Sequence, residues 1–155
     1  MIPRKLWYEA VDEANSLIDD DIEVDIQGYD IDGEVVKAAR ENAREAGVEH
    51  LIHFQERAVK DLRHPKKYGF IITNPPYGER LEEKSALPAL YREFGESFKK
   101  LDSWSAYMIT SYEETERYFG RKADKNRKIY NGMLKTYFYQ FLGPKPPRRK
   151  KYPEI

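Results

Sequence analysis

The sequence predicts an α/β fold in which a doubly wound, mostly parallel sheet is closed by a C-terminal antiparallel hairpin. Apolar strand segments alternate with helical patterns along most of the 155 residues, an order typical of parallel sheets covered by helices. Near the end, Asn131-Gly132 separates two β-rich segments, a strong hairpin signal. We expect one domain over residues 1–142, followed by a basic, proline-rich tail over 143–155.

The first half of the chain alternates between helical and strand patterns. Asp32 is placed to cap a helix N-terminus, and Gly47 stands where helices commonly end. The segments expected here are a helix over 4–18, a strand over 22–29, a helix over 33–46 and a strand over 51–55.

The second half continues the alternation and then turns to β structure. The apolar segment 69–73 suits the middle of a parallel sheet. Ligands of such sheets bind at the carboxyl ends of the strands, so residues directly after a strand are the site candidates. The segments expected here are strands over 69–73, 104–110, 127–130 and 133–141, with helices over 86–100 and 112–119.

Composition excludes several classes of protein. The sequence has no cysteine, which rules out disulfide frameworks, zinc–thiolate sites, iron–sulfur clusters and cysteine nucleophiles. No apolar segment is long enough for a membrane helix, and the N-terminus lacks a signal-peptide pattern. The three histidines lack metal-ligand spacing, so we expect no metal. We expect a cytoplasmic protein.

Basic residues are concentrated at the C-terminal end. The net charge is zero, yet residues 120–155 contain eleven Lys or Arg and only two acidic residues. Such a distribution favours an anionic partner, nucleic acid first, although a solvated tail would have the same composition. Arg121, Lys122 and Lys125 are the first candidate phosphate contacts, and Arg127 and Lys128 are further candidates.

The most informative segment is Asn74-Pro75-Pro76-Tyr77, directly after the apolar strand. Two prolines end the strand and stiffen the loop. The Asn74 side-chain oxygen and the Pro75 carbonyl can each accept a hydrogen bond, and the Tyr77 ring can stack on a flat heterocycle. These groups suit an exocyclic amine on a nucleobase, held for attack on an electrophile without a strong base. A rigid turn is the simpler alternative.

A second candidate follows the strand expected over 22–29. Asp30 can accept both hydroxyls of a ribose, as an acidic residue does in dinucleotide-binding folds.

The motifs resemble those of a known family. Asn74-Pro75-Pro76-Tyr77 resembles the amino-methylation motif of class I S-adenosylmethionine-dependent methyltransferases. Its continuation Gly78-Glu79-Arg80-Leu81 is similar to the THUMP-associated RNA methyltransferases, which include the large-subunit ribosomal RNA guanine-N2 enzymes. The segment from Gly120 to Thr136 also resembles the C-terminal region of that family.

The resemblance implies site residues and a cofactor. It implies that Asp30 holds the ribose of S-adenosylmethionine and that Ile31 lies beside its adenine. Asn74 is implied to be the catalytic amide, close to the methionine part of the cofactor, and Pro75 its partner acceptor. Pro76 completes the motif, and Tyr77 is implied to stack on the target base.

Two departures from the family pattern concern the cofactor. Ala58 stands where the family often has an adenine-binding Asp, so the backbone of Val59 or the side chain of Asp61 would take over that contact. The family also opens with a strand and a glycine-rich loop, whereas residues 1–27 contain no glycine. We therefore expect the C-terminal part of a methyltransferase domain, inactive alone, with an open sheet edge that promotes self-association.

The leading hypothesis is N-methylation of an exocyclic base amine in RNA, with guanine N2 of ribosomal RNA as the expected target. Two alternatives stay open. One is the same chemistry on adenine N6 or on a glutamine, because the Asn-Pro-Pro-Tyr motif alone does not distinguish these amines. The other is a non-catalytic folded remnant or RNA-binding piece.

Overall fold

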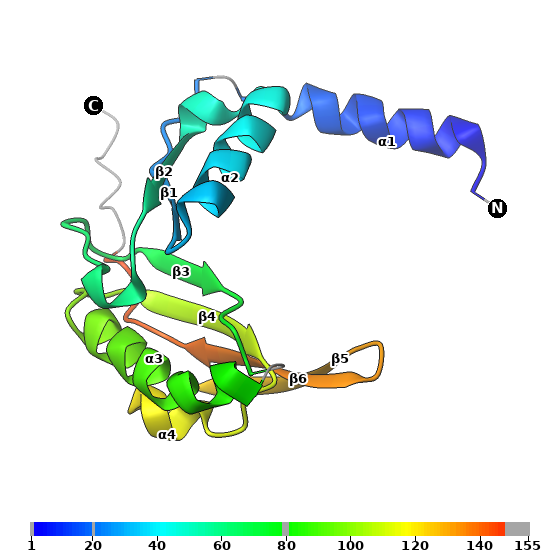
Figure 1. Ribbon diagram of the computed structural model, residues 1–155. Helices are drawn as coiled ribbons and strands as arrows, with labels where there is room; N and C mark the ends of the chain where they lie inside the picture. The colour runs from blue at the N-terminus through cyan, green and yellow to red at the C-terminus, as the bar shows by residue number, and fades with distance from the viewer. Residues whose placement is uncertain (1, 20, 79–80, 148–155) are drawn as a thin grey trace. The chain divides into compact units, whose positions relative to one another are not determined.

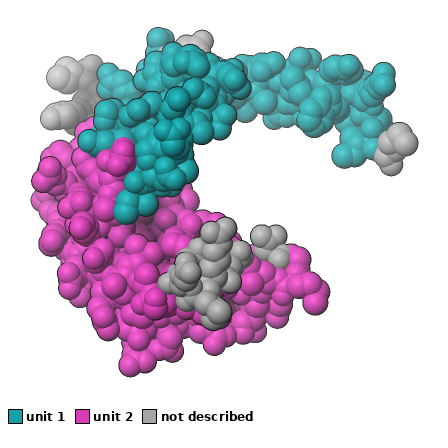
Figure 2. Space-filling model, viewed as in Figure 1, with its two compact units in different colours: residues 1–55 teal, residues 56–155 magenta. Residues whose placement is uncertain are grey.

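A computed structural model describes residues 2–19, 21–78 and 81–147 of the chain. Glu79 and Arg80 of the extended motif, and residues 148–155 of the expected tail, lie outside this description. The chain divides into two compact units, residues 1–55 and residues 56–155 (Figure 2).

The first unit contains a helix followed by a two-stranded sheet with its own helix. The β1 and β2 strands are hydrogen-bonded neighbours in that sheet. Its elements are α1 (Arg4–Ser16), β1 (Ile26–Asp30), α2 (Gly33–Glu45), the 3-10 helix η1 (Glu49–Leu51) and β2 (Ile52–Glu56).

Most expectations for this unit are confirmed. Asp32 caps α2, accepting a hydrogen bond from the Glu34 backbone N–H at 2.9 Å. Gly47 follows the end of α2 with a φ of 72°, which favours glycine. The strand expected from residue 22 is wrong at its start, because β1 begins at Ile26. Ile22 is exposed, and β2 is too short to pair with a strand that begins there.

The second unit is a four-stranded mixed sheet with helices on one face (Figure 1). The strand order is β3-β4-β6-β5. Its elements are the 3-10 helix η2 (Val59–Asp61), β3 (Phe70–Thr73), α3 (Leu81–Lys99), β4 (Ser105–Thr110), α4 (Thr115–Phe119), β5 (Lys125–Asn131) and β6 (Leu134–Phe141).

The core of this unit lies between α3, α4 and one face of the sheet. Alternate residues of β4 and β6 point into it, as the period of two requires. Aromatic rings dominate the packing, and Phe119 lies 4.2 Å from Phe141, centroid to centroid. The buried cluster consists of Leu87, Tyr91, Phe94, Phe98, Ala106, Met108, Phe119, Tyr139 and Phe141.

Strand directions determine which loops share an edge of the sheet. The β3 and β4 strands are parallel, with Thr73 opposite Met108. The β6 strand is antiparallel to both β4 and β5, so it alone runs against the other three. The expected hairpin at Asn131-Gly132 is confirmed, with Asn131 opposite Leu134.

The second unit differs from expectation at its helices. Residues 81–99 form α3, which begins five residues before the expected start at 86 and contains Pro88 in its interior. A proline usually occupies the first turn of a helix rather than its interior, so the sequence pattern does not predict the part of α3 that precedes Pro88. The α4 helix is shorter than expected, because it begins at Thr115 rather than 112.

Candidate functional site

The Asn74-Pro75-Pro76-Tyr77 segment forms the loop that leaves the carboxyl end of β3 and leads to α3 (Figure 1). We call residues 74–78 the NPPY loop. All its peptide bonds are trans. Asn74 and Pro76 are exposed, whereas Pro75 and Tyr77 are partly buried. The prediction that this segment stands at the end of an apolar strand is therefore confirmed.

A buried tyrosine of α3 holds the loop. The Tyr91 hydroxyl donates to the Pro76 carbonyl at 3.3 Å and lies 2.7 Å from the Thr110 hydroxyl at the end of β4. Tyr91 is 1% exposed, and burial raises its pKa to about 12. It is therefore a neutral hydrogen-bond donor at physiological pH. Tyr91 thus connects the loop to both the helix and the neighbouring strand.

Gly78 closes the loop where only glycine fits. Its φ is 78°, in the left-handed region. A Cβ at this position would lie 2.8 Å from Lys84 Cγ and 3.0 Å from Leu87 Cδ1. Leu87 is buried in the core. The loop can therefore turn closely over the first turns of α3.

The two predicted acceptors of the loop are available to a ligand. Within the described part of the chain, neither the Asn74 side chain nor the Pro75 carbonyl has a hydrogen-bond partner. The adjacent Pro76 carbonyl, by contrast, is occupied by Tyr91. The loop therefore presents one free amide and one free carbonyl beside the partly exposed ring of Tyr77.

Asp30 ends β1 in the first unit, as predicted. Its Oδ1 accepts a hydrogen bond from the Asp32 backbone N–H at 2.9 Å, which fixes the carboxylate. Among the residues that the structure describes, none engages the second carboxylate oxygen, which leaves it for a hydroxyl pair. The adjacent Ile31 side chain is 73% exposed. Both residues are therefore accessible for the ribose and adenine contacts, which stay predictions.

The predicted adenine contact of the second unit lies in a short 3-10 turn. Val59 begins η2 and packs against the core, while Asp61 is exposed. The turn is fixed to α3, because the Ser97 hydroxyl donates to the Lys60 carbonyl at 3.0 Å. Ala58 precedes this turn in extended conformation.

The first three candidate phosphate contacts have different environments. Arg121 Nη2 donates to Asp124 Oδ2 and to the Leu142 carbonyl, each at 2.8 Å. Arg121 therefore joins the end of α4 to the end of β6. Lys122 and Lys125 are exposed, and neither has an ion-pair partner among the residues that the structure describes.

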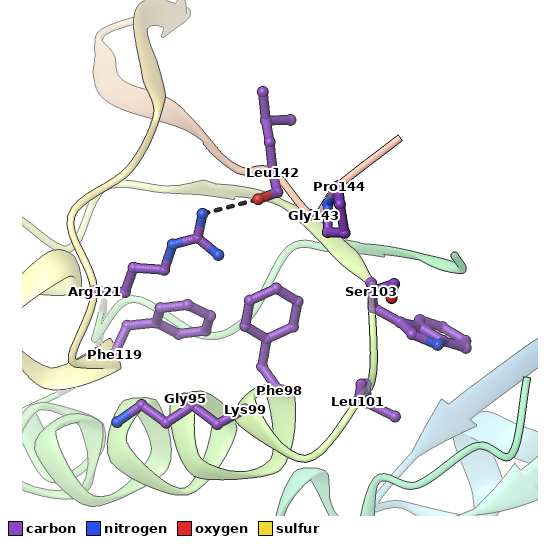
Figure 3. Close-up of a pocket in the computed structure, with 11 residues that line it drawn as sticks. Gly95, Phe98, Lys99, Leu101, Ser103, Phe119, Arg121, Leu142, Gly143 and Pro144 are labelled. Atoms are coloured by element: carbon purple, nitrogen blue, oxygen red, sulfur yellow. Dashed lines mark hydrogen bonds between the residues drawn. The ribbon is translucent and has the colours of Figure 1, made fainter. Parts of the chain in front are cut away.

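A pocket of about 230 Å³ lies beside Arg121, between the C-terminal part of α3 and the segment after β6 (Figure 3). Its lining includes Ser103 and Trp104, which precede β4, and Gly143 and Pro144, which follow β6. These residues lie at the amino end of β4, whereas the NPPY loop is at the carboxyl end of β3. The structure therefore does not bring Arg121 to the NPPY loop.

The pocket also involves the start of the expected tail. The Gly143 backbone N–H donates to the Ser105 hydroxyl at 2.9 Å, so the chain remains attached to the sheet at this point.

Among the described residues, no helix is long and apolar enough to cross a membrane. The same residues contain no cluster of three or more His, Cys, Asp or Glu that could bind a metal ion.

Sequence reasoning missed Tyr91 and Thr110. Tyr91 stands inside an amphipathic helix, where an apolar core position is the simplest interpretation. Its role depends on a contact fifteen positions away in the sequence. The role of Tyr91 becomes visible only in the folded structure, where α3 packs beside the NPPY loop.

Comparison with known proteins identifies relatives along nearly the whole chain. Residues 1–140 match the family model described as "RMKL-like, methyltransferase domain". "Putative RNA methyltransferase YpsC" of Bacillus subtilis is 45% identical over 150 residues, which cover 97% of this chain and 39% of that protein. The ribosomal RNA large subunit methyltransferase K/L of Shewanella oneidensis is 41% identical over 136 residues, covering 85% of this chain and 19% of that protein.

A solved structure shares the fold. SMU.472, "a putative methyltransferase complexed with SAH", matches with a TM-score of 0.83 and 43% identity, covering 94% of this chain and 39% of that one. This similarity confirms the predicted methyltransferase-like α/β fold. The chain spans well under half the length of these relatives.

Proposed function

Because the chain belongs to the RMKL-like methyltransferase domain family, we propose that it takes part in S-adenosylmethionine-dependent N-methylation of an exocyclic base amine in RNA. The proposed target is guanine N2 of ribosomal RNA, and the proposed place of action is the cytoplasm. The observation that carries the proposal is the NPPY loop, in which two unoccupied acceptors stand beside an aromatic ring.

The loop groups match the needs of amine methylation. Asn74 Oδ1 and the Pro75 carbonyl accept the two amine hydrogens, and the Tyr77 ring stacks on the base. Both hydrogen bonds draw the nitrogen lone pair out of conjugation with the ring, which makes it a better nucleophile. Tyr91 fixes the loop through Pro76, so the acceptors are pre-organised before the base arrives.

When bound, S-adenosylmethionine supplies an electrophilic methyl group attached to a positively charged sulfur. The Asn74 side chain and the Pro75 carbonyl would hold the amine so that its nitrogen can take up this methyl group, with the electron pair of the carbon–sulfur bond returning to sulfur. The proton released by the nitrogen passes to solvent. The Asp30 carboxylate would hold the ribose through the oxygen that the Asp32 backbone N–H does not engage, and Ile31 and the Val59 backbone would each supply an adenine contact, as the family resemblance implies.

The described residues supply only part of a cofactor site. No glycine precedes Gly28 in the sequence, so residues 1–27 contain no glycine-rich loop to bring backbone N–H groups close to the cofactor. Residues 1–155 alone should therefore bind S-adenosylmethionine more than a hundredfold more weakly than a polypeptide that includes such a loop. That is a deficit of at least about 2.7 kcal/mol.

Self-association of the isolated chain is part of the proposal. The β3 strand is at one edge of its sheet, and Phe70 and Ile72 on it are 66% and 84% exposed. An apolar edge strand can pair with a second copy. Sedimentation of residues 1–155 at increasing concentration should therefore show dimers or larger species, and a strictly monomeric chain would contradict this part.

The function is tested by offering alternative amines. The whole polypeptide in which these residues occur is incubated with methyl-labelled S-adenosylmethionine and one of three substrates: deproteinised large-subunit ribosomal RNA, adenine-containing DNA, or a glutamine-containing release-factor peptide. Labelled RNA that yields N2-methylguanosine on digestion supports the proposal. Label confined to DNA or to the peptide would replace it with an alternative amine, and no transfer to any substrate would favour a non-catalytic remnant.

A further inference from the structure

The β5–β6 hairpin extends well beyond the rest of its sheet (Figure 1). Thr73, the last residue of β3, is level with Met108, which is opposite Tyr139 of β6. The hairpin continues from Tyr139 back to Leu134, which is opposite Asn131 at the turn. At about 3.4 Å per residue, the turn lies roughly 17 Å beyond the end of β3.

This overhang is on the same edge of the sheet as the NPPY loop. The β6 strand is antiparallel to β4, so its first residues extend past the carboxyl end of β4. The carboxyl ends of β3 and β4 point the same way, because these strands are parallel. A ligand held at the NPPY loop is therefore on the side of the sheet to which the hairpin extends.

The extending part of the hairpin is basic and carries exposed apolar side chains. Residues 125–135 include four Lys or Arg and no acidic residue. Tyr130 is 64% exposed and Met133 is 100% exposed. An aromatic ring and a thioether that are both exposed at a protruding tip are available to a binding partner.

One face of the hairpin combines the aromatic ring with cations. Tyr130 is directly opposite Lys135, and Lys128 is on the same face because it precedes Tyr130 by two residues. Lys135 lies 3.4 Å from Glu113, a carboxylate that partly neutralises it. Lys128 has no ion-pair partner within the described residues. An aromatic ring flanked by cations is suited to a nucleobase and its neighbouring phosphates.

We propose that the β5–β6 hairpin is an RNA-docking arm, in which Tyr130 stacks on an unpaired nucleobase near the target nucleotide and Lys128 binds a phosphate. The proposal rests on the proposed function for its choice of RNA. A second copy of the chain is the less suitable occupant, because Lys125, Arg127 and Lys128 on the β5 edge would repel the same strand of another copy.

The test measures the binding of residues 1–155 to a fluorescent RNA stem-loop taken from large-subunit ribosomal RNA, over a series of salt concentrations. Tyr130→Ala should raise the Kd at least fivefold, and Tyr130→Phe should change it less than twofold, because stacking needs the ring and not the hydroxyl. Lys128→Gln should weaken binding and lower the salt slope by about 0.7. Lys100→Gln is the matched control, since this exposed lysine follows α3 at the opposite end of the sheet.

A Tyr130→Ala chain that binds the RNA as tightly as the unaltered chain would overturn the docking arm. If that substitution also abolishes self-association, the tip is a contact between copies instead. Methyl transfer by the whole polypeptide separates the two proposals. If it methylates RNA equally well with Tyr130→Ala, the arm fails and the function stands; if Tyr130 controls RNA binding but no methyl is transferred, the function fails and the arm stands.

Discussion

The hydroxyl of Tyr91 and the carbonyl oxygen of Pro76 lie 3.3 Å apart, and this hydrogen bond fixes the middle of the NPPY loop to a residue halfway along α3. The same hydroxyl lies 2.7 Å from Thr110 at the end of β4. A loop that must hold an amine by two hydrogen bonds depends on such support, because small displacements of positioned groups are costly in rate. Tyr91 is therefore a positioning residue for the proposed reaction.

Tyr91→Phe should impair methyl transfer while the fold is retained. The change removes one hydroxyl and leaves the ring in the core, so the free energy of unfolding should fall by about 1 kcal/mol. We expect the methyl-transfer rate of the whole polypeptide to fall three- to tenfold with RNA affinity unchanged. Tyr118→Phe is the control, because Tyr118 is a partly buried ring of α4 distant in sequence from the loop. Equal rates for both variants would remove Tyr91 from the mechanism.

The same tyrosine predicts how stability depends on alkaline pH. Burial raises the pKa of Tyr91 to about 12, above the value of about 10 for an exposed tyrosine. The folded state therefore retains this proton more strongly than the unfolded state. The resulting stabilisation is complete below pH 10 and is lost as the pH rises to 12, up to about 3 kcal/mol. Denaturant unfolding at a series of pH values should show this loss, and Tyr91→Phe should abolish this component. A variant with the same alkaline profile as the unaltered chain would contradict the assignment.

Gly78 and Gly47 allow backbone strain to be separated from crowding. Both have a left-handed φ, 78° and 72°. A Cβ at Gly78 would meet Lys84 and Leu87, whereas nothing lies within 4 Å of a Cβ at Gly47. Gly47→Ala should therefore cost only the conformational term of about 1 kcal/mol, and Gly78→Ala should cost at least about 1 kcal/mol more. Thermal unfolding of both variants measures the difference, and equal losses would show that the loop can move away from α3.

The three cations predicted to bind phosphate should separate into two groups. Arg121→Gln removes the hydrogen bonds to Asp124 Oδ2 and to the Leu142 carbonyl after β6, so the free energy of unfolding should fall by about 1 kcal/mol. Lys122→Gln and Lys125→Gln together should leave stability unchanged and reduce the salt slope of RNA binding by about 0.7 for each phosphate that the lysines neutralise. An unchanged slope for the double variant would show that these two lysines face solvent in the complex.

The sequence predicted the order of the elements because their signals are local. Asp32 caps α2 through its own side chain, and the Asn131-Gly132 turn specifies its hairpin within a few residues. The start of β1 was missed because alternation alone does not show where a partner strand ends. The start of α3 at Leu81 was missed because Pro88 lies inside the helix, where proline normally disfavours helical structure before it.

For the candidate site, too, the locally encoded parts were predictable and the parts that depend on tertiary contacts were not. The NPPY loop follows β3 directly and Asp30 is the last residue of β1, so strand prediction located both segments. Tyr91 and the engagement of Arg121 by Asp124 and Leu142 depend on tertiary contacts. A single sequence does not distinguish a core tyrosine from one that supports a loop, or a cation that binds carbonyls from one that binds RNA.

The central claim is that Asn74 holds the amine that receives the methyl group, and its most direct test is the single-turnover rate of methyl transfer to ribosomal RNA by Asn74→Ala in the whole polypeptide. We expect at least a tenfold slower rate, or about 1.4 kcal/mol of lost transition-state stabilisation. The affinity for S-adenosylmethionine, measured by calorimetry on the same samples, should change less than the rate. An unchanged rate with Asn74→Ala would contradict the account.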